Sequence, residues 1–351
     1  MGKRFLMKGN EALAEAAIRA GCRHFFGYPI TPQTEVAAYM AKRMPKIGGT
    51  YLQAESEVAA INMVLGAAAA GARAMTSSSS PGISLKTEGI SYIIGSDLPC
   101  VVVNVMRGGP GLGGIQPSQS DYWQATRALG HGDGHALVFA PSSIQEIVDL
   151  MRKAFDLAEE YRMPAMILAD GMLGQMMEPV EFPETEYLPQ EKPWALTGHK
   201  KKRPPNIVNS LYLNPSELEQ TIIERFERYR VIEDTEAMGE SFLMEDAQYA
   251  VAAYGIAARV AKSAVLAARD EGIKVGMIRP ITVWPFPKEA FSHADQLSGI
   301  LCVELSMGQM IEDVRLSVNG RCPVEFVGRT GGLVPTPDEV LVAIRNMAGI
   351  L

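Results

Sequence analysis

The sequence predicts an α/β protein built from two parallel-sheet units joined by a charged linker. Three observations support this: apolar strand patterns alternate with helix patterns over residues 1–180, proline and charge rise over residues 181–245, and the alternation returns over residues 246–351. Strands that alternate with helices form parallel sheets. A chain of 351 residues is also long for a single core, so two domains are expected.

The first unit contains one clear buried strand within a series of alternating elements. Residues 98–107 are almost continuously apolar, as expected of a central parallel strand covered on both faces. Residues 10–20 repeat small apolar side chains at helical spacing and are stopped by Gly21. The expected helices are residues 10–20, 53–72 and 144–160, and the expected strands are residues 24–28, 74–76, 98–107, 136–140 and 165–170.

The linker and the second unit follow the same logic. Pro204 and Pro205 mark a break, and Pro215 opens a charged helix through about residue 230, so residues 181–245 are predicted to be a linker with an embedded helix. Beyond it, we expect strands at residues 248–255, 274–279 and 300–304 and a helix at residues 257–271.

Charge and hydropathy exclude several classes of protein. The net charge of −7 disfavours nucleic-acid binding, which needs a basic face, and the basic run at residues 200–203 is typical of a solvated loop. The N-terminus lacks the apolar stretch of a signal peptide, and no segment is apolar for long enough to span a membrane. We therefore expect a cytoplasmic protein with no nucleic-acid or membrane partner.

The cysteines do not form a ligand pattern. Cys22, Cys100, Cys302 and Cys322 are widely separated, with no Cys-x-x-Cys pair and no histidines at zinc-site spacing. The sequence predicts buried, reduced thiols and no metal site. Local cysteines cannot hold a four-cysteine iron–sulfur cluster.

Two glycine patterns resemble cofactor motifs but lack their context. Residues 109–114 fit G-x-G-x-x-G after a strand, yet no helix opens behind them to receive a pyrophosphate, so we interpret them as a substrate-site loop. Gly132-Asp133-Gly134 resembles the start of a thiamine-type magnesium motif, but residues 158–162 contain no asparagine to complete it. We interpret this triplet as a turn.

Three side chains are candidates for chemistry. Glu57 shares a helix face with Ala60, Ile61 and Val64, where a carboxylate is costly without a partner, although an acid near a helix N-terminus is also ordinary. The helix pattern alone leaves both interpretations open. Arg107 ends an apolar strand, where a guanidinium suits a carboxylate substrate, and Thr31 follows another strand end; each is also compatible with an ordinary loop role.

Taken together, these segments resemble the pyrimidine-binding domain of thiamine diphosphate enzymes, in the order Glu57, a small-residue helix, MTSSSSPG at residues 75–82, and the strand after residue 99. More narrowly, GYPITP at 27–32, ESE at 55–57 and MRGGPG at 106–111 resemble the α subunit of 2-oxoacid:ferredoxin oxidoreductases. The segment from YGIA at 254–257 to RPITVWP at 279–285 is similar to the transketolase C-terminal-type domain of that subunit.

The resemblance implies roles for the candidate residues. Glu57 would hydrogen-bond N1′ of the aminopyrimidine and favour the imino tautomer that activates thiazolium C2. Thr31 and Arg107 would hold the carboxylate and keto oxygen of the substrate, and Tyr28, Pro29 and Ile30 would contact the cofactor. The reaction implied is oxidative decarboxylation of a 2-oxoacid, with coenzyme A taking the acyl group and ferredoxin taking the electrons.

The resemblance also implies partners. The pyrophosphate and Mg²⁺ site and an iron–sulfur cluster would lie on a β subunit, with a γ subunit and a small ferredoxin-like subunit completing the complex. The chain is similar to the form that acts on branched-chain 2-oxoacids such as 3-methyl-2-oxobutanoate; 2-oxoglutarate or pyruvate enzymes are the alternative. A 2-oxoglutarate site needs a second cation, for which Lys86 and Arg127 are candidates with ordinary surface interpretations. A non-catalytic assembly subunit is the second alternative, disfavoured by the presence of Glu57 and Arg107.

Overall fold

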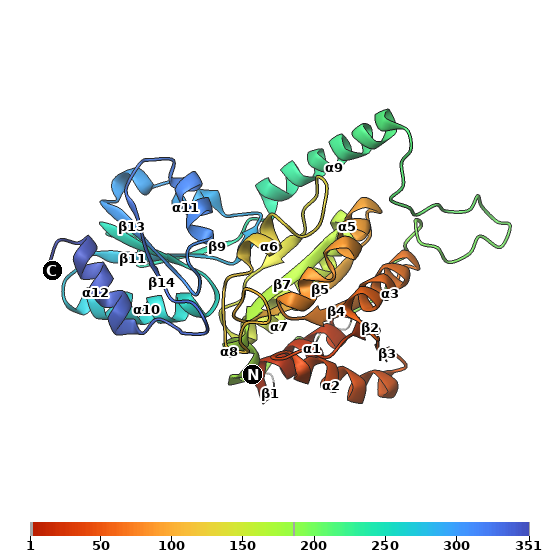
Figure 1. The fold of residues 1–351 in the computed structure, drawn as a ribbon, viewed down its shortest axis with the longest axis horizontal. Helices are drawn as coiled ribbons and strands as arrows, with labels where there is room; N and C mark the ends of the chain where they lie inside the picture. The colour runs from red at the N-terminus through yellow and green to blue at the C-terminus, as the bar shows by residue number, and fades with distance from the viewer. Residues whose placement is uncertain (1–2, 185–186, 351) are drawn as a thin grey trace.

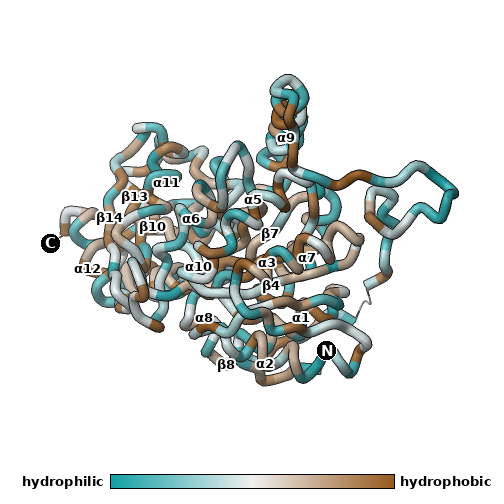
Figure 2. Tube along the Cα trace, turned by 45° about the vertical axis from the view of Figure 1, so that its right-hand side comes forward, coloured by the Kyte–Doolittle hydropathy of each residue, from teal (hydrophilic) through white to brown (hydrophobic). Residues whose placement is uncertain are grey.

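The computed structural model describes residues 3–184 and 187–350. Figure 1 shows two sheets side by side, with α9 (Pro215–Thr235) running above the larger one and a loop that precedes α9 projecting away from the body. β8 (Met177–Glu181) lies at the base of the larger part (Figure 2). Within the described ranges, no helix combines the length and apolar character required to cross a bilayer.

The larger sheet has seven strands in the order β12-β6-β7-β5-β4-β2-β3. All neighbouring strands are parallel except β12, which runs antiparallel to β6. Its strands are β2 (His24–Gly27), β3 (Thr50–Gln53), β4 (Ala74–Ser78), β5 (Cys100–Met106), β6 (Leu137–Phe139), β7 (Pro164–Asp170) and β12 (Thr282–Trp284). The flanking helices are α1 (Gly9–Arg19), α2 (Thr34–Arg43), α3 (Glu57–Ala69), α4 (Pro81–Ser84), α5 (Thr87–Gly95), α6 (Tyr122–Thr126), α7 (Ile144–Tyr161) and α8 (Gly171–Gln175), and β1 (Arg4–Lys8) pairs with β8 as a separate ribbon.

The smaller sheet has five strands in the order β14-β13-β10-β11-β9, parallel except for β9. Its strands are β9 (Gly239–Phe242), β10 (Tyr249–Ala253), β11 (Val275–Pro280), β13 (Gly299–Glu304) and β14 (Val324–Gly328), and its helices are α10 (Gly255–Asp270), α11 (Met310–Val318) and α12 (Pro337–Met347). Figure 2 shows hydrophobic chain concentrated in the strands and facing helices, with hydrophilic chain on the outer loops.

The predicted parallel α/β class is confirmed, with one informative difference in the region of Glu57. Residue 53 ends strand β3 instead of starting a helix, and α3 begins at Glu57. The cause is Ser56, whose hydroxyl accepts a hydrogen bond from the backbone N–H of Ala59 at 3.1 Å and so caps the helix. Glu55 therefore precedes the helix and is exposed, although the predicted helix of residues 53–72 included it.

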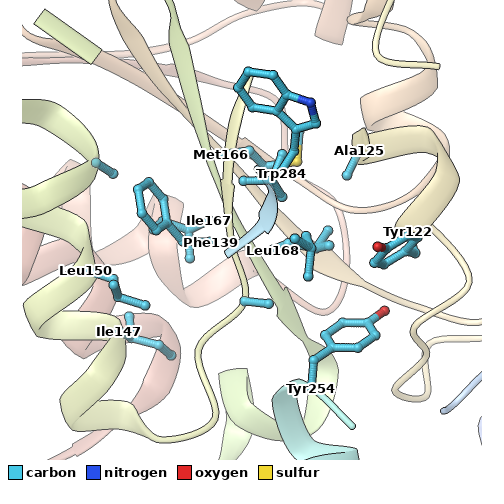
Figure 3. Packing of buried hydrophobic residues seen from close by; sticks show 14 of the residues in the cluster. Tyr122, Ala125, Phe139, Ile147, Leu150, Met166, Ile167, Leu168, Tyr254 and Trp284 are labelled. Atoms are coloured by element: carbon cyan, nitrogen blue, oxygen red, sulfur yellow. The ribbon is translucent and has the colours of Figure 1, made fainter. Parts of the chain in front are cut away.

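The predicted linker helix is present and is longer than expected, because it packs against the larger sheet. Tyr229 lies in van der Waals range of Trp284, with ring centroids 5.4 Å apart, and its hydroxyl accepts from the backbone N–H of His135 at 3.1 Å. Arg225 and Arg228 both pair with Asp97. Trp284, on β12, lies over Met166 of β7 in Figure 3. A strand from the C-terminal third of the sequence thus joins the first sheet, which the domain limits inferred from sequence did not include.

Candidate functional site

The candidate site residues lie where the parallel strands of the larger sheet end. β2 runs into residues 28–33, β4 into residues 79–82, and β5 into Arg107, and these strands are neighbours in the sheet. Because parallel strands end at the same edge, segments distant in sequence meet there. Thr31 and Arg107, 76 residues apart, are in direct contact at this edge.

Glu57 is the first residue of α3 and is 6% exposed. Its position in the first helical turn favours a negative charge. Its carboxylate lies against Gly82 so closely that a Cβ there would be 2.8 Å from Oε1. The residues that the structure describes donate no hydrogen bond to this carboxylate, although a buried carboxylate normally has partners. This position is compatible with both interpretations of Glu57, because the residue is a helix-terminal acid and its buried carboxylate also faces Gly82.

Lys86 is fully buried, at 0% exposure, and its Nζ donates no hydrogen bond. Its surface interpretation was therefore wrong. Burial lowers the pKa of this lysine to about 8, and the negative charge of Glu57 opposes the shift. The sequence offered no signal for this, because Lys86 sits between the exposed Leu85 and the partly buried Thr87.

Arg107 joins two loops of the site. Its guanidinium donates to the carbonyl oxygen of Thr31 at 3.0 Å and to that of Leu112 at 3.1 Å, while its buried Nε has no partner. The glycine-rich stretch at residues 109–114 folds back over Arg107, with the N–H of Gly114 donating to the carbonyl of Gly108. The loop interpretation of this stretch agrees with the structure, and Arg107 fixes its position relative to Thr31.

The candidate cofactor residues after β2 form the rim of this edge. Tyr28 and Pro29 are exposed and Ile30 is partly buried. The N–H of Gln33 donates to the carbonyl of Ile30 at 3.3 Å, which closes the turn that presents Thr31. Thr31 itself is exposed, so its side chain is accessible from solvent.

A buried polar network that the sequence analysis did not identify holds this edge together. Asp121 accepts from the Ser80 hydroxyl at 2.6 Å and from the Asn104 amide at 2.9 Å, and the Ser80 hydroxyl also contacts the Arg107 backbone. Burial raises the pKa of Asp121, and the hydrogen bonds from Ser80 and Asn104 oppose the rise. Ser80 adopts φ +29°, a strained value for a non-glycine residue. Asn104, inside an otherwise apolar strand, was the available sequence signal.

Several buried hydroxyl groups near the end of β4 have no hydrogen-bond partner. They are Thr76 Oγ1, Ser78 Oγ and Ser79 Oγ, and with Lys86 Nζ they form a set of orphaned polar atoms along one short segment. Buried polar atoms without partners are rare and indicate a strained or ligand-binding region. Donors and acceptors of this kind, beside a carboxylate, fit a polar heteroaromatic ligand such as an aminopyrimidine.

Several large hydrophobic side chains are exposed next to the site residues in the sequence. Large hydrophobic side chains exposed there include Val58, Leu85, Ile115 and Leu112, the last at 86% exposure. An apolar rim around a polar centre is typical of an interaction surface.

The site edge also contacts the smaller sheet: Gln119 donates to the carbonyl of Tyr254 at 2.8 Å and accepts from the N–H of Leu305 at 3.0 Å. Tyr254 packs on Tyr122 beside this contact (Figure 3).

Two other features do not carry the chemistry. A cavity of about 710 Å³ lies near the N-terminal end of β4, where Arg73 is already paired with Asp156 at 2.6 Å and with Glu159 at 2.7 Å. Arg127, a candidate second substrate cation, pairs instead with Glu312 and Asp313.

The described residues contain no group of three or more His, Cys, Asp or Glu side chains that could hold a metal ion. The cysteines are buried, and burial raises the pKa of Cys22 and of Cys100 to about 12.

Comparison with known proteins agrees with this architecture. Residues 15–237 match the family model of the pyruvate flavodoxin/ferredoxin oxidoreductase thiamine diphosphate-binding domain, and residues 247–340 match pyruvate:ferredoxin oxidoreductase core domain II. Ketoisovalerate oxidoreductase subunit VorB of Methanothermobacter thermautotrophicus is 48% identical over 98% of both chains. 2-Oxoglutarate synthase subunit KorA of the same organism is 36% identical over 99% of this chain and 100% of its own.

Solved structures show the same arrangement. A 2-oxoglutarate:ferredoxin oxidoreductase from Magnetococcus marinus, with 2-oxoglutarate, coenzyme A and succinyl-CoA bound, superposes with a TM-score of 0.89 at 28% identity, over 99% of this chain and 65% of that longer chain. A split-gene transketolase, at a TM-score of 0.62 and 15% identity, shares the fold alone.

The fold and the family models define a thiamine diphosphate-binding domain followed by a transketolase C-terminal-like domain, as the sequence indicated. The chain belongs to the 2-oxoacid:ferredoxin oxidoreductases and is one subunit of such an enzyme.

Proposed function

We propose that this subunit supplies Glu57 to the pyrimidine ring of thiamine diphosphate and Thr31 and Arg107 to the 2-oxoacid, in an active site completed by another chain. The observation that carries the proposal is the buried Glu57 carboxylate, which has no hydrogen-bond partner among the described residues and lies at the strand edge where Arg107 meets Thr31. The overall reaction converts a 2-oxoacid and coenzyme A to an acyl-CoA and CO₂, with two electrons passing one at a time to ferredoxin.

The bound cofactor is expected to provide a nucleophilic carbon that attacks the keto group and accepts the electrons of decarboxylation. The protein's own task is positional and acid–base. Glu57 shares a proton with the ring nitrogen N1′, and its burial keeps water from competing for that proton. Arg107 has further N–H donors on its terminal nitrogens with which to bind the substrate carboxylate, while its two bonds to backbone carbonyls fix its geometry.

The substrate we propose is a branched-chain 2-oxoacid, 3-methyl-2-oxobutanoate. The higher identity to the ketoisovalerate subunit than to the 2-oxoglutarate subunit, 48% against 36%, supports this choice. A 2-oxoglutarate or pyruvate enzyme is the alternative, and a non-catalytic assembly subunit is a second one. Arg127 does not favour 2-oxoglutarate, because its guanidinium is already paired with two carboxylates.

The proposed partner subunits would supply the cofactor and cluster sites that the described residues of this chain do not form. A β subunit would hold the diphosphate, Mg²⁺ and an iron–sulfur cluster, and a γ subunit and a small ferredoxin-like subunit would complete the complex. The apolar rim formed by Val58, Leu85, Leu112 and Ile115 supports burial against another chain.

The test is a ferredoxin- or viologen-linked assay of the chain co-expressed with its partner subunits, across several 2-oxoacids, with Glu57→Gln alongside. We expect turnover by the complex, none by the isolated chain, and a loss of about 10²-fold or more in kcat for Glu57→Gln, the usual size of an acid–base contribution. Turnover by the chain alone would refute the shared site, and full activity of Glu57→Gln would refute the role of that carboxylate.

A further inference from the structure

Lys86 is a buried cation, and its local contacts do not explain why a charged side chain occupies this position. Its side chain is 0% exposed and its ammonium makes no hydrogen bond within the described structure, yet an ammonium is among the most costly groups to bury unpaired. It also occupies the N-cap position of α5 without a side-chain cap hydrogen bond, and the dipole of this nine-residue helix disfavours a positive charge at that end. An apolar side chain would suit this position better, so the charge itself needs an explanation.

The packing of three helices brings this charge toward Glu57. α5 packs on α3, with Gly89 against Ile61 so closely that a Cβ on the glycine would lie 2.4 Å from Ile61 Cγ2. Glu57 lies one turn before Ile61 and Lys86 almost one turn before Gly89, so both charges lie at the N-terminal ends of adjacent helices. α4, between them in sequence, brings Gly82 against the Glu57 carboxylate.

We propose that Lys86 is a positioning residue that acts through Glu57: its buried ammonium stabilises the ionised form of that carboxylate, so that the carboxylate is ready to take up a proton when the pyrimidine ring binds. This inference rests on the role proposed above for Glu57. Burial alone favours a neutral carboxyl group, and a neighbouring positive charge restores the anion. Glu57 is also the charged group that acts on Lys86: burial lowers the pKa of Lys86 to about 8, and the Glu57 charge opposes that shift.

The proposal predicts how many protons are taken up on cofactor binding. An ionised Glu57 must acquire a proton to share with N1′, so binding to the wild-type complex takes up close to one proton at pH 7. Without the Lys86 charge, the Glu57 carboxylate loses this electrostatic support, and the uptake is expected to fall. Titration calorimetry with thiamine diphosphate and Mg²⁺, in two buffers of different ionisation enthalpy, measures this number directly and without turnover.

The variants are made in the co-expressed complex. Lys86→Met removes the charge at nearly constant length, Lys86→Gln is the smaller neutral alternative if methionine is not accommodated, and Lys86→Arg retains the charge. Lys42→Met, at an exposed position on α2, controls for the loss of a lysine. We expect proton uptake to fall by at least a third in Lys86→Met, with kcat about tenfold lower and the KM for the 2-oxoacid within about twofold of wild type. Lys86→Arg and Lys42→Met should match wild type in proton uptake.

A double-mutant cycle tests whether Lys86 acts through Glu57. In a Glu57→Gln background, Lys86→Met should change proton uptake no further. Wild-type uptake in Lys86→Met, with Glu57→Gln impaired, would overturn the role of Lys86 and leave the proposed function intact. An effect of Lys86→Met confined to the KM for 2-oxoglutarate would also overturn it, since Lys86 would then contact a distal carboxylate. Full activity and unchanged cofactor affinity in Glu57→Gln would instead refute the proposed function.

Discussion

Replacing Gly82 by alanine tests the position of Glu57 without removing its carboxylate. A Cβ at residue 82 would lie 2.8 Å from Glu57 Oε1 and 2.1 Å from Ser78 Oγ, whereas ordinary van der Waals contact begins near 3.4 Å. The carboxylate must therefore retreat by about 0.6 Å, the difference between 3.4 and 2.8 Å, and the hydroxyl by about 1.3 Å, the difference between 3.4 and 2.1 Å. Glycine at this position is required by close approach, since its φ is not in the left-handed region.

A misplacement of 1 Å at a reacting group can cost about 10²-fold in rate, so we expect kcat/KM of Gly82→Ala to fall about 10- to 100-fold, or about 1.4–2.7 kcal/mol of transition-state stabilisation. Overpacking should lower the free energy of unfolding by about 1–3 kcal/mol. The assay is steady-state reduction of ferredoxin by the assembled complex, with thermal unfolding of the same samples measured separately.

Two further variants separate strain from displacement of the carboxylate. Gly66→Ala is the matched control, because Gly66 lies exposed within α3 and nothing stands within 4 Å of its added Cβ; it should retain full activity and gain about 0.5–1 kcal/mol in stability. Adding Ser78→Ala to Gly82→Ala removes the 2.1 Å contact and leaves the contact with Glu57, so stability should recover while activity stays low. Wild-type kcat/KM in Gly82→Ala, or full recovery in the double variant, would refute the reasoning.

Two other predictions follow from the site. Arg107→Lys should raise the KM for the 2-oxoacid and lower kcat/KM about tenfold or more, because a lysine cannot bridge the Thr31 and Leu112 carbonyls and still present a planar pair of donors; an unchanged KM would contradict a role in carboxylate binding. Asp170 is fully buried, with its pKa raised from 3.8 to about 6 by burial, so its contribution to stability is present below pH 4 and is lost as the pH rises through 6. The Asp170 side chain caps α8, and Asp170→Asn keeps an acceptor there. Because asparagine does not ionise, this variant should avoid about 1–3 kcal/mol of the stability that the wild type loses between pH 4 and pH 7. The free energy of unfolding should then depend less steeply on pH in the variant, and equal slopes in both proteins would contradict the prediction.

Much of the fold could be predicted from the sequence, because most helices and buried strands are set by the pattern of neighbouring residues. The apolar run that became β5 and the amphipathic pattern that became α7 required only local periodicity. The strand at Thr282–Trp284 was missed, since a three-residue antiparallel edge strand has no periodicity of its own and exists because β6 offers it a partner. The start of α3 differs from the prediction because the Ser56 cap begins the helix at Glu57, although helix-forming residues are common on both sides of it.

The sequence by itself determined the class of this protein and its candidate residues, because Glu57, Thr31 and Arg107 lie in short ordered motifs and at strand ends. Tertiary structure decided which groups act together. Thr31 and Arg107 are in contact because parallel strands end at the same edge of the sheet. The close packing of α3, α4 and α5 places Glu57 against Gly82, where its charge interacts with that of Lys86. Burial and charge pairing arise only when distant segments meet, so a lysine between an exposed leucine and a threonine in the sequence becomes a buried cation in the folded protein.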